Sequence, residues 1–329
     1  MKRIDMSSRV LPQLQDNVFQ GRFFEPGVER VPIRCDPLDE SAGFLGIGRS
    51  TTFPLPQWRA RDPYRTVFFD EGEGRTLVFV HGLGGNATHW EFVVRELVGS
   101  YRVVGLDLVG CGWSLKPRVS SYGIEFLRDH LLDFLERRNI RRATLVGHSL
   151  GGAVSIAAAL KRPDIVDSLA LICAAGLAPL PSWMRIGSRA LLHEKILYTF
   201  LMLGANFILG NVFVDNEDEN RYVRWFRESS VRDAPGYPNF KDFVRVGMYL
   251  CRDAVQKDYS KQLRDLDVPV LALIGDHDKL TSMSSTLQHL DSIRRLRTVI
   301  ISRCGHMPMI ERPEETLFHL MRFLTRPPT

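Results

Sequence analysis

Short apolar runs alternate with amphipathic stretches along most of the chain after residue 60. The runs are rich in Val, Ile and Leu, which is typical of strands buried on both faces of a sheet. Strands are predicted at residues 65–69, 76–82, 101–108, 143–148, 168–174, 268–276 and 297–302. Helices are predicted at residues 89–98, 124–137, 150–160 and 314–324. This alternation predicts an α/β fold with a mainly parallel central sheet and helices on both faces.

Two parts of the chain depart from this alternation. Residues 176–264 contain helical patterns separated by polar turns, and an insertion between two strands of one sheet predicts a helical cap. The first 60 residues are rich in Pro, Gly and Arg and show little periodicity, so we interpret them as an extension that is wrapped on the surface or partly disordered. Regular structure is expected to begin near Arg65. The predicted organisation is an N-terminal extension (1–60), a first core part (61–175), the cap (176–264) and a second core part (265–329).

Composition and charge narrow the class of protein. Hydrophobic residues make up 44% of the chain and charged residues 25%, as in globular proteins with a large core. The net charge is +5, but basic and acidic residues are interspersed, so no nucleic-acid partner is expected. The five cysteines are widely spaced and form no CxxC pair, which favours reduced thiols in a cytoplasmic protein over disulfides or a metal site. The first residues contain no apolar core of signal-peptide length.

One stretch without charged side chains, residues 196–214, approaches the length of a membrane span. Asn206, Asn211, Gly204 and Gly210 interrupt it, and it lies among patterns typical of a globular protein. We therefore interpret it as helices whose apolar surfaces are buried or face a substrate. Shallow contact of the cap with a lipid surface stays an alternative.

The candidate chemistry begins with one serine between two elements. Ser149 lies where the predicted strand 143–148 becomes the predicted helix 150–160, and Gly147 and Gly151 flank it. A GxSxG pattern alone should occur by chance about 0.1 times in a chain of this length. Its position is more informative, because a sharp strand-to-helix turn needs neighbours without Cβ atoms and exposes one hydroxyl at a helix N-terminus. This arrangement suits nucleophilic attack on a carbonyl group.

A glycine-rich turn, VHGLGG at 80–85, follows another predicted strand. Its backbone N–H groups would be free to bind a negative charge. The N–H groups of Leu83 and Leu150 are the candidates for holding a developing oxyanion. Alternatively, Gly84 and Gly85 form only a tight turn.

Acidic and basic partners for the serine are available after two later strands. The segment LIGDHDKL at 273–280 offers Asp276 and Asp278, and RCGHMP at 303–308 offers His306. Each of these residues could instead be an ordinary surface or structural residue. However, serine, aspartate and histidine occur in the chain order that this chemistry takes on such a sheet.

Together these motifs resemble the α/β-hydrolase superfamily, in its capped esterase, lipase and C–C hydrolase branch. The resemblance covers residues 65–175 and 265–325. It is carried by HGLGG at 81–85, DLVGCGWS at 107–114, GHSLGG at 147–152, GDHD at 275–278 and GH at 305–306. Two features depart from the family: the N-terminal extension is long, and the cap matches no motif of a known substrate class.

The resemblance implies a role for each matched residue. Ser149 would be the nucleophile and His306 the base, and the family's G-x-x-D spacing selects Asp278 rather than Asp276 as the acid. Asp107 would head a loop that shapes the active-site side of the core. Serine as the nucleophile argues against the epoxide hydrolases and haloalkane dehalogenases, which carry aspartate there.

The implied reaction is hydrolysis of a carboxylic ester through an acyl-enzyme, with no metal or organic cofactor. Only the cap and the adjoining loop could indicate the substrate, and their apolar residues would either line an acyl pocket or form the cap's own core. The candidate lining residues are Trp183, Met184, Tyr198, Phe200, Met202, Phe207 and Met307. A small hydrophobic ester is therefore expected. Cleavage of a thioester or a C–C bond, perhydrolysis, and a non-catalytic binding role are the alternatives.

Overall fold

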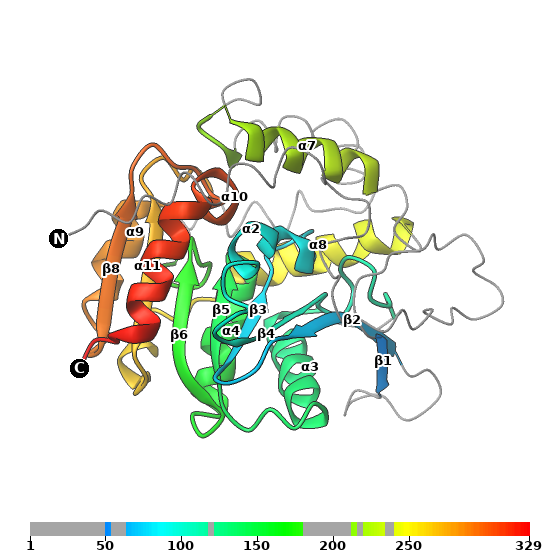
Figure 1. Cartoon of the computed structure of the whole chain (residues 1–329), viewed down its shortest axis with the longest axis horizontal. Helices are drawn as coiled ribbons and strands as arrows, with labels where there is room; N and C mark the ends of the chain where they lie inside the picture. The colour runs from blue at the N-terminus through cyan, green and yellow to red at the C-terminus, as the bar shows by residue number, and fades with distance from the viewer. Residues whose placement is uncertain (1–49, 54–63, 118–121, 180–211, 216–219, 234–239) are drawn as a thin grey trace.

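The computed structural model describes most of the chain around one central sheet (Figure 1). The described residues are 50–53, 64–117, 122–179, 212–215, 220–233 and 240–329. Within these residues, eight strands form one sheet in the order β1-β2-β4-β3-β5-β6-β7-β8. They are β1 (Ser50–Phe53), β2 (Tyr64–Glu71), β3 (Thr76–Val80), β4 (Arg102–Leu106), β5 (Ala143–His148), β6 (Val166–Ile172), β7 (Val270–Gly275) and β8 (Leu296–Ile301). Only β1–β2 and β2–β4 pair antiparallel, which confirms the predicted mainly parallel sheet.

Helices connect the strands. They are η1 (Ala87–Trp90), α2 (Glu91–Val94), α3 (Ile124–Arg137), α4 (Leu150–Lys161), α7 (Arg221–Asp233), α8 (Phe240–Gln256), η3 (Leu263–Asp265), α9 (Met283–Leu290), α10 (Pro308–Glu311) and α11 (Pro313–Thr325). Helices α7 and α8 lie between β6 and β7 in the chain, inside the region predicted to form a cap. In Figure 1, α11 crosses in front of the sheet and α7 lies above α10.

Each face of the sheet has its own hydrophobic core because successive strand residues point to opposite faces. Phe68 and Val78 pack in one cluster with residues of α3 and α4. Their neighbours Phe69 and Phe79 belong to a second cluster, which contains Trp90 and residues of α11. Both faces are therefore covered, as the Val-rich and Leu-rich strands require.

The observed elements differ from the predicted ones at several places. Regular structure does not start near Arg65, because residues 50–53 already form β1; this short, polar edge strand carries no apolar pattern. The predicted helix 89–98 is shorter, since after Val94 the chain closes turns, including one from the Leu97 N–H to the Val94 carbonyl. Helices α9 and α10 were not predicted, and neither has a long apolar stripe.

The described residues bear on the predicted membrane contact and on the state of the cysteines. In the described part of the chain, no helix combines the length and the apolarity that crossing a bilayer requires. Most of the charge-free stretch 196–214 lies outside the described residues. Cys111, Cys173, Cys251 and Cys304 are free thiols.

The turn from β5 to α4 is very tightly packed. A Cβ atom on Gly151 would lie 2.2 Å from the carbonyl oxygen of Val80, and one on Gly147 would lie 2.6 Å from the carbonyl oxygen of Gly151. Ser149 stands between them with φ of 51°, a backbone conformation that L-residues rarely adopt. Glycine at both neighbours is therefore a steric requirement of this turn.

We expect Gly151→Ala to lower the free energy of unfolding by about 3 kcal/mol, the upper end of what overpacking costs, because its methyl group would meet backbone atoms that cannot move aside. Gly247 in α8 is the matched control, since a Cβ there would meet nothing within 4 Å. Gly247→Ala should raise the same free energy by about 0.5–1 kcal/mol. Urea unfolding of both variants measures the difference, and equal stabilities would contradict the packing argument.

One charged cluster joins β2, β4 and Arg138, the residue that directly follows α3. Both oxygens of Asp70 accept hydrogen bonds from Arg102, at 2.8 and 2.7 Å, and Oδ2 accepts a third from Arg138 at 2.8 Å. Burial by itself would raise the pKa of Asp70, but the hydrogen bonds and positive charges of the two arginines outweigh it and lower the pKa below its ordinary value. The carboxylate therefore stabilises the fold in its ionised form.

Because the pKa of Asp70 is lower in the folded state, its contribution is present above about pH 4 and is lost as the pH falls further. Asp70→Asn should lower the free energy of unfolding at pH 7 by about 1.5–3 kcal/mol. Its loss of stability below pH 4 should be shallower than that of the unmodified protein. Chemical unfolding across this pH range measures both, and parallel curves would refute the assignment.

Candidate active site

The predicted site residues lie beyond the carboxyl ends of three strands of the sheet. Ser149 directly follows β5, Asp278 follows β7, and His306 follows β8. Parallel strands present their carboxyl ends at the same edge, and that is where α/β sheets place their sites. Ser149 is partly exposed and is the N-cap residue directly before α4, so its hydroxyl stands at a helix N-terminus.

The side chains of Asp278 and His306 are in direct contact. His306 Nδ1 lies 2.8 Å from Asp278 Oδ2, and both side chains are buried. Asp278 Oδ1 also accepts hydrogen bonds from the backbone N–H groups of Leu280 and Thr281, and Oδ2 accepts one from the Thr281 hydroxyl. Burial would raise the pKa of Asp278, but the hydrogen bond and charge of His306, together with Thr281, lower it to about 2. The ionised carboxylate can only accept, so Nδ1 of His306 carries the proton and Nε2 is left as a base.

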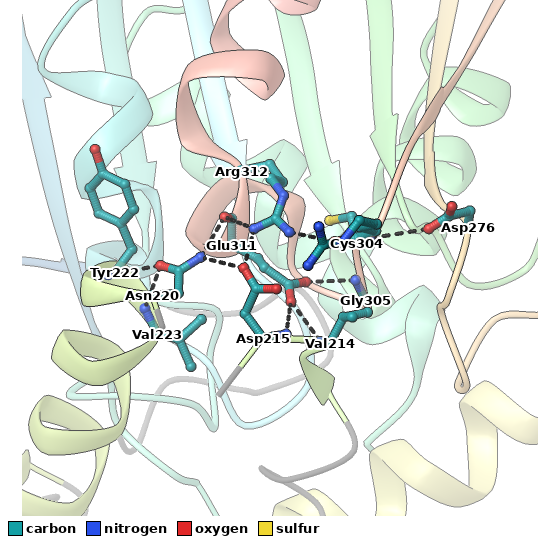
Figure 2. A network of polar contacts seen from close by, with 11 residues as sticks. Val214, Asp215, Asn220, Tyr222, Val223, Asp276, Cys304, Gly305, Glu311 and Arg312 are labelled. Carbon is teal, nitrogen blue, oxygen red and sulfur yellow. Dashed lines mark hydrogen bonds and ion pairs between the residues drawn. The ribbon is translucent and has the colours of Figure 1, made fainter. Parts of the chain in front are cut away.

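Asp276, the other acidic candidate, has different partners. Its Oδ1 lies 2.6 Å from Nδ1 of His277 and accepts a hydrogen bond from the backbone N–H of Cys304 at 3.1 Å. Figure 2 shows it beside Cys304, at the margin of the network that is drawn there. Asp276 therefore holds the loop after β8, whereas Asp278 contacts the imidazole of His306.

The main chain of His306 is held on both sides. Its N–H donates to the carbonyl oxygen of Val212 at 2.7 Å, and its carbonyl oxygen accepts from Nε2 of His148 at 2.8 Å. Burial lowers the pKa of His148 well below its ordinary value, so this ring is neutral. The rings of His148 and His306 lie 4.8 Å apart. Sequence reasoning missed His148, although its place beside Ser149 was a signal.

The glycine-rich turn after β3 lies against the serine. A Cβ atom on Gly82 would come within 3.1 Å of the Ser149 Cβ, so the loop packs directly on the residue. His81 fixes this loop, because its Nδ1 contacts the Gly82 carbonyl oxygen at 2.7 Å and its Nε2 accepts the Leu108 N–H at 2.9 Å. Burial lowers the pKa of His81 to about 4, which keeps the ring neutral for these two roles.

The two candidate oxyanion donors are available. Within the described part of the chain, neither the Leu83 nor the Leu150 backbone N–H donates a hydrogen bond. Leu83 is 40% exposed, and Leu150 is the first residue of α4. Both N–H groups can therefore take a new acceptor.

Asp107 supports the loop as the resemblance implies. Its carboxylate accepts the N–H of Ala87 at 2.7 Å and that of Trp113 at 2.8 Å, joining the segments after β3 and β4. Burial raises its pKa to about 6 against the effect of these hydrogen bonds. Asp107 is therefore a structural acceptor within the loops.

A buried thiol also lies beside the Asp278–His306 pair. The Sγ of Cys173, a carboxylate oxygen of Asp278 and a ring nitrogen of His306 all lie within 4.8 Å of one another. Such a grouping could hold a metal ion. However, Asp278 and His306 are hydrogen-bonded to each other, and burial raises the pKa of Cys173 well above its ordinary value. These contacts describe a hydrogen-bonded pair beside a protonated thiol better than a metal centre.

The predicted substrate-binding residues are mostly outside the described residues. This applies to Trp183, Met184, Tyr198, Phe200, Met202 and Phe207. Met307 is described and buried next to His306. Phe226 of α7 packs on Phe213 and on His89 of η1, with ring centroids 5.4 and 5.0 Å apart. An aromatic contact thus joins α7 to η1, which follows β3 in the chain.

Comparisons with known proteins identify the family to which the chain belongs. A family model described as "Alpha/beta hydrolase family" matches residues 77–318. The chain is 27% identical over 274 residues to a 2-hydroxy-6-oxo-6-(2'-aminophenyl)hexa-2,4-dienoic acid hydrolase of Metapseudomonas resinovorans, covering 79% of this chain and 88% of the relative. It is also 27% identical over 248 residues to a pimeloyl-[acyl-carrier protein] methyl ester esterase of Nitrosomonas europaea, covering 74% and 93%.

The fold of this chain is similar to a solved structure over almost the whole length of that structure. It is a thermophilic esterase from Thermogutta terrifontis, with a TM-score of 0.73 and 20% identity, and the match covers 84% of this chain and 98% of the esterase. At this identity the likeness shows the fold alone. The matched residues of the family model span the sheet from β3 to β8 and every candidate site residue described above. The chain therefore belongs to the alpha/beta hydrolase family and is a hydrolase.

Proposed function

We propose that this hydrolase cleaves a carboxylic ester with a hydrophobic acyl group, using Ser149, His306 and Asp278. The observation that carries the proposal is the 2.8 Å hydrogen bond between His306 and the ionised Asp278, at the sheet edge where Ser149 is held in a strained turn. A buried carboxylate that fixes the proton on Nδ1 makes Nε2 a base, and a base is what a serine hydroxyl needs for attack.

The proposed reaction is acyl transfer in two halves. The Ser149 oxygen attacks the ester carbonyl while Nε2 of His306 takes its proton, and Asp278 stabilises the imidazolium. The backbone N–H groups of Leu83 and Leu150 bind the oxyanion, a contact whose loss typically costs about 3 kcal/mol per donor. His306 then returns the proton to the leaving alcohol and activates the water that hydrolyses the acyl-enzyme.

The hydrophobic acyl group is inferred from the residues around the site and from the relatives. Within the region predicted as a cap, residues 196–214 carry no charged side chain. Phe213 and Phe226 contribute aromatic surface beside His89. Residues 176–264 are proposed to cover the site as that cap. Two of the similar proteins are named as esterases.

Hydrolysis of a C–C bond is the second candidate. It is favoured by the similarity to the hexadienoic acid hydrolase of Metapseudomonas resinovorans. The same three residues would serve both reactions, so substitutions cannot distinguish them and substrates must be compared. The test measures turnover of esters of increasing acyl length and of a vinylogous 1,5-diketone. Turnover of the diketone alone would favour the second candidate.

Ser149→Ala and His306→Ala should each reduce kcat on p-nitrophenyl esters by about 10⁴-fold or more, because each removes a group that takes part in bond formation. Ser149→Ala should also abolish labelling by a fluorophosphonate. Ser284→Ala, at an exposed serine in α9, is the matched control and should keep full activity and labelling. Full labelling of the Ser149→Ala protein would disprove the assignment of the nucleophile.

Asp278→Asn should lower kcat by about 10⁴-fold, because an amide that faces Nδ1 stabilises the wrong tautomer of His306. Asp276→Asn, the same chemical change two residues away, should lower kcat less than about tenfold, since Asp276 binds His277 and the backbone of Cys304 and not the imidazole of His306. Steady-state kinetics on one ester compares the two variants. A larger loss from Asp276→Asn would reverse the assignment of the acid.

A further inference from the structure

A buried carboxylate next to the site bridges two segments that are distant in sequence. Glu311, at the end of α10, is 1% exposed. Its Oε1 accepts hydrogen bonds from the backbone N–H groups of Val214 at 2.6 Å and Asp215 at 2.7 Å, and its Oε2 accepts one from Gly305 at 2.6 Å. Figure 2 shows the carboxylate between Gly305 on one side and Val214 and Asp215 on the other.

Further polar contacts close this bridge, which we call the Glu311 clamp (Glu311, its three N–H donors, Asn220 and Arg312). Asn220 donates to the Glu311 carbonyl oxygen at 2.9 Å and to Asp215 Oδ2 at 3.1 Å. Arg312 donates to Asp215 Oδ2 at 2.5 Å and to the Arg303 carbonyl oxygen at 2.7 Å. The segment at 212–215 and the loop after β8 are thus joined at several points.

His306 lies inside the joined region. Its N–H donates to the Val212 carbonyl oxygen, and a Cβ atom on the preceding Gly305 would lie only 2.2 Å from that same oxygen. The loop and the segment at 212–215 therefore touch through their backbones. If the segment moved away, the main chain of His306 would lose one of its two hydrogen bonds.

The segment also connects to the helix above the site. The Phe213 ring packs on Phe226 of α7, and Phe226 packs on His89 of η1. Helix α7 also contacts α10, where Glu311 lies. A displacement of α7 would therefore reach the backbone around His306 through residues 212–215.

We propose that Glu311 is a positioning residue that couples residues 212–215 and α7 to the orientation of His306. The proposal rests on the function proposed above, in which His306 is the base. Glu311 touches no reacting atom; it sets the imidazole by holding the backbone on which the imidazole is carried. The positions of α7 and His306 are therefore linked. The imidazole of His306 is correctly oriented when residues 212–215, which contact α7, are also bound to Glu311.

The chemistry of the clamp identifies the informative substitution. Glu311→Gln keeps the shape of the side chain but replaces one acceptor oxygen by an N–H donor, which would face at least one backbone N–H. A buried N–H group left without an acceptor typically costs about 1–3 kcal/mol. The introduced amide N–H and the backbone N–H that it faces repel each other. This repulsion is relieved when residues 212–215 and the loop after β8 separate, and the separation moves Gly305 and His306.

Glu311→Gln should lower kcat on a p-nitrophenyl ester by about 10²-fold, the cost of a misplaced catalytic group, with KM almost unchanged. The rate constant for fluorophosphonate labelling of Ser149 should fall by the same factor. Asp70→Asn is the control for stability, because it also removes a carboxylate with three donors. Asp70 binds Arg102 at the start of β4, whereas His306 lies beyond the carboxyl end of β8. Asp70→Asn should lower the unfolding temperature without lowering kcat.

The decisive comparison uses the His306→Ala background. If Glu311 acts through His306, Glu311→Gln should slow labelling of Ser149 in the unmodified protein but cause no further decrease in His306→Ala. An equal decrease in both backgrounds would overturn the proposal. Absence of labelling in the unmodified protein would instead overturn the proposed function, so the two failures are distinguishable.

A milder variant covers the case in which Glu311→Gln does not fold. Asp215→Asn removes the charge that binds Arg312 but leaves the carboxylate of Glu311 in place. It should cause a smaller decrease in labelling, again only when His306 is present. A decrease that is independent of His306 would count against the coupling.

Discussion

The close contact between the β5–α4 turn and strand β3 is the constraint on which the rest of the structure depends. Because a Cβ at Gly151 would meet the Val80 carbonyl, the helix can begin only where this residue has no side chain. The contact forces Ser149 into the left-handed region of backbone space and brings it against Gly82. Strain of this kind persists only where the surrounding packing enforces it, and here two buried cores, one on each face of the sheet, do so.

Positioning of the imidazole follows a second physical rule, that buried polar groups need partners. Each polar group of His306 that faces the interior has one: Asp278 binds the ring, Val212 binds the N–H, and His148 binds the carbonyl oxygen. Three different parts of the chain therefore determine the position of one side chain. The Glu311 clamp extends the same logic, since one carboxylate satisfies three backbone donors on two segments.

Membership of the alpha/beta hydrolase family sets the reaction class but not the substrate. The relatives include both a hexadienoic acid hydrolase and a methyl ester esterase, at the same identity of 27%. The proposed nucleophile, base and oxyanion donors would serve any acyl-like electrophile, because the same fold hosts many reactions. Selectivity must therefore come from other groups around the substrate, and in the proposed function these belong to the region predicted as a cap.

The amino-acid sequence by itself determined the elements whose signal is local. Valine-rich and leucine-rich runs predicted the strands of a mainly parallel sheet, and the glycines around Ser149 predicted the sharp turn. It could not predict β1, which has no apolar pattern, or show which of Asp276 and Asp278 touches His306 without the family spacing. Glu311 and His148 escaped notice because their partners lie far away in the chain. Only the tertiary structure decided these contacts, since a buried carboxylate or imidazole is defined by the groups that folding brings to it.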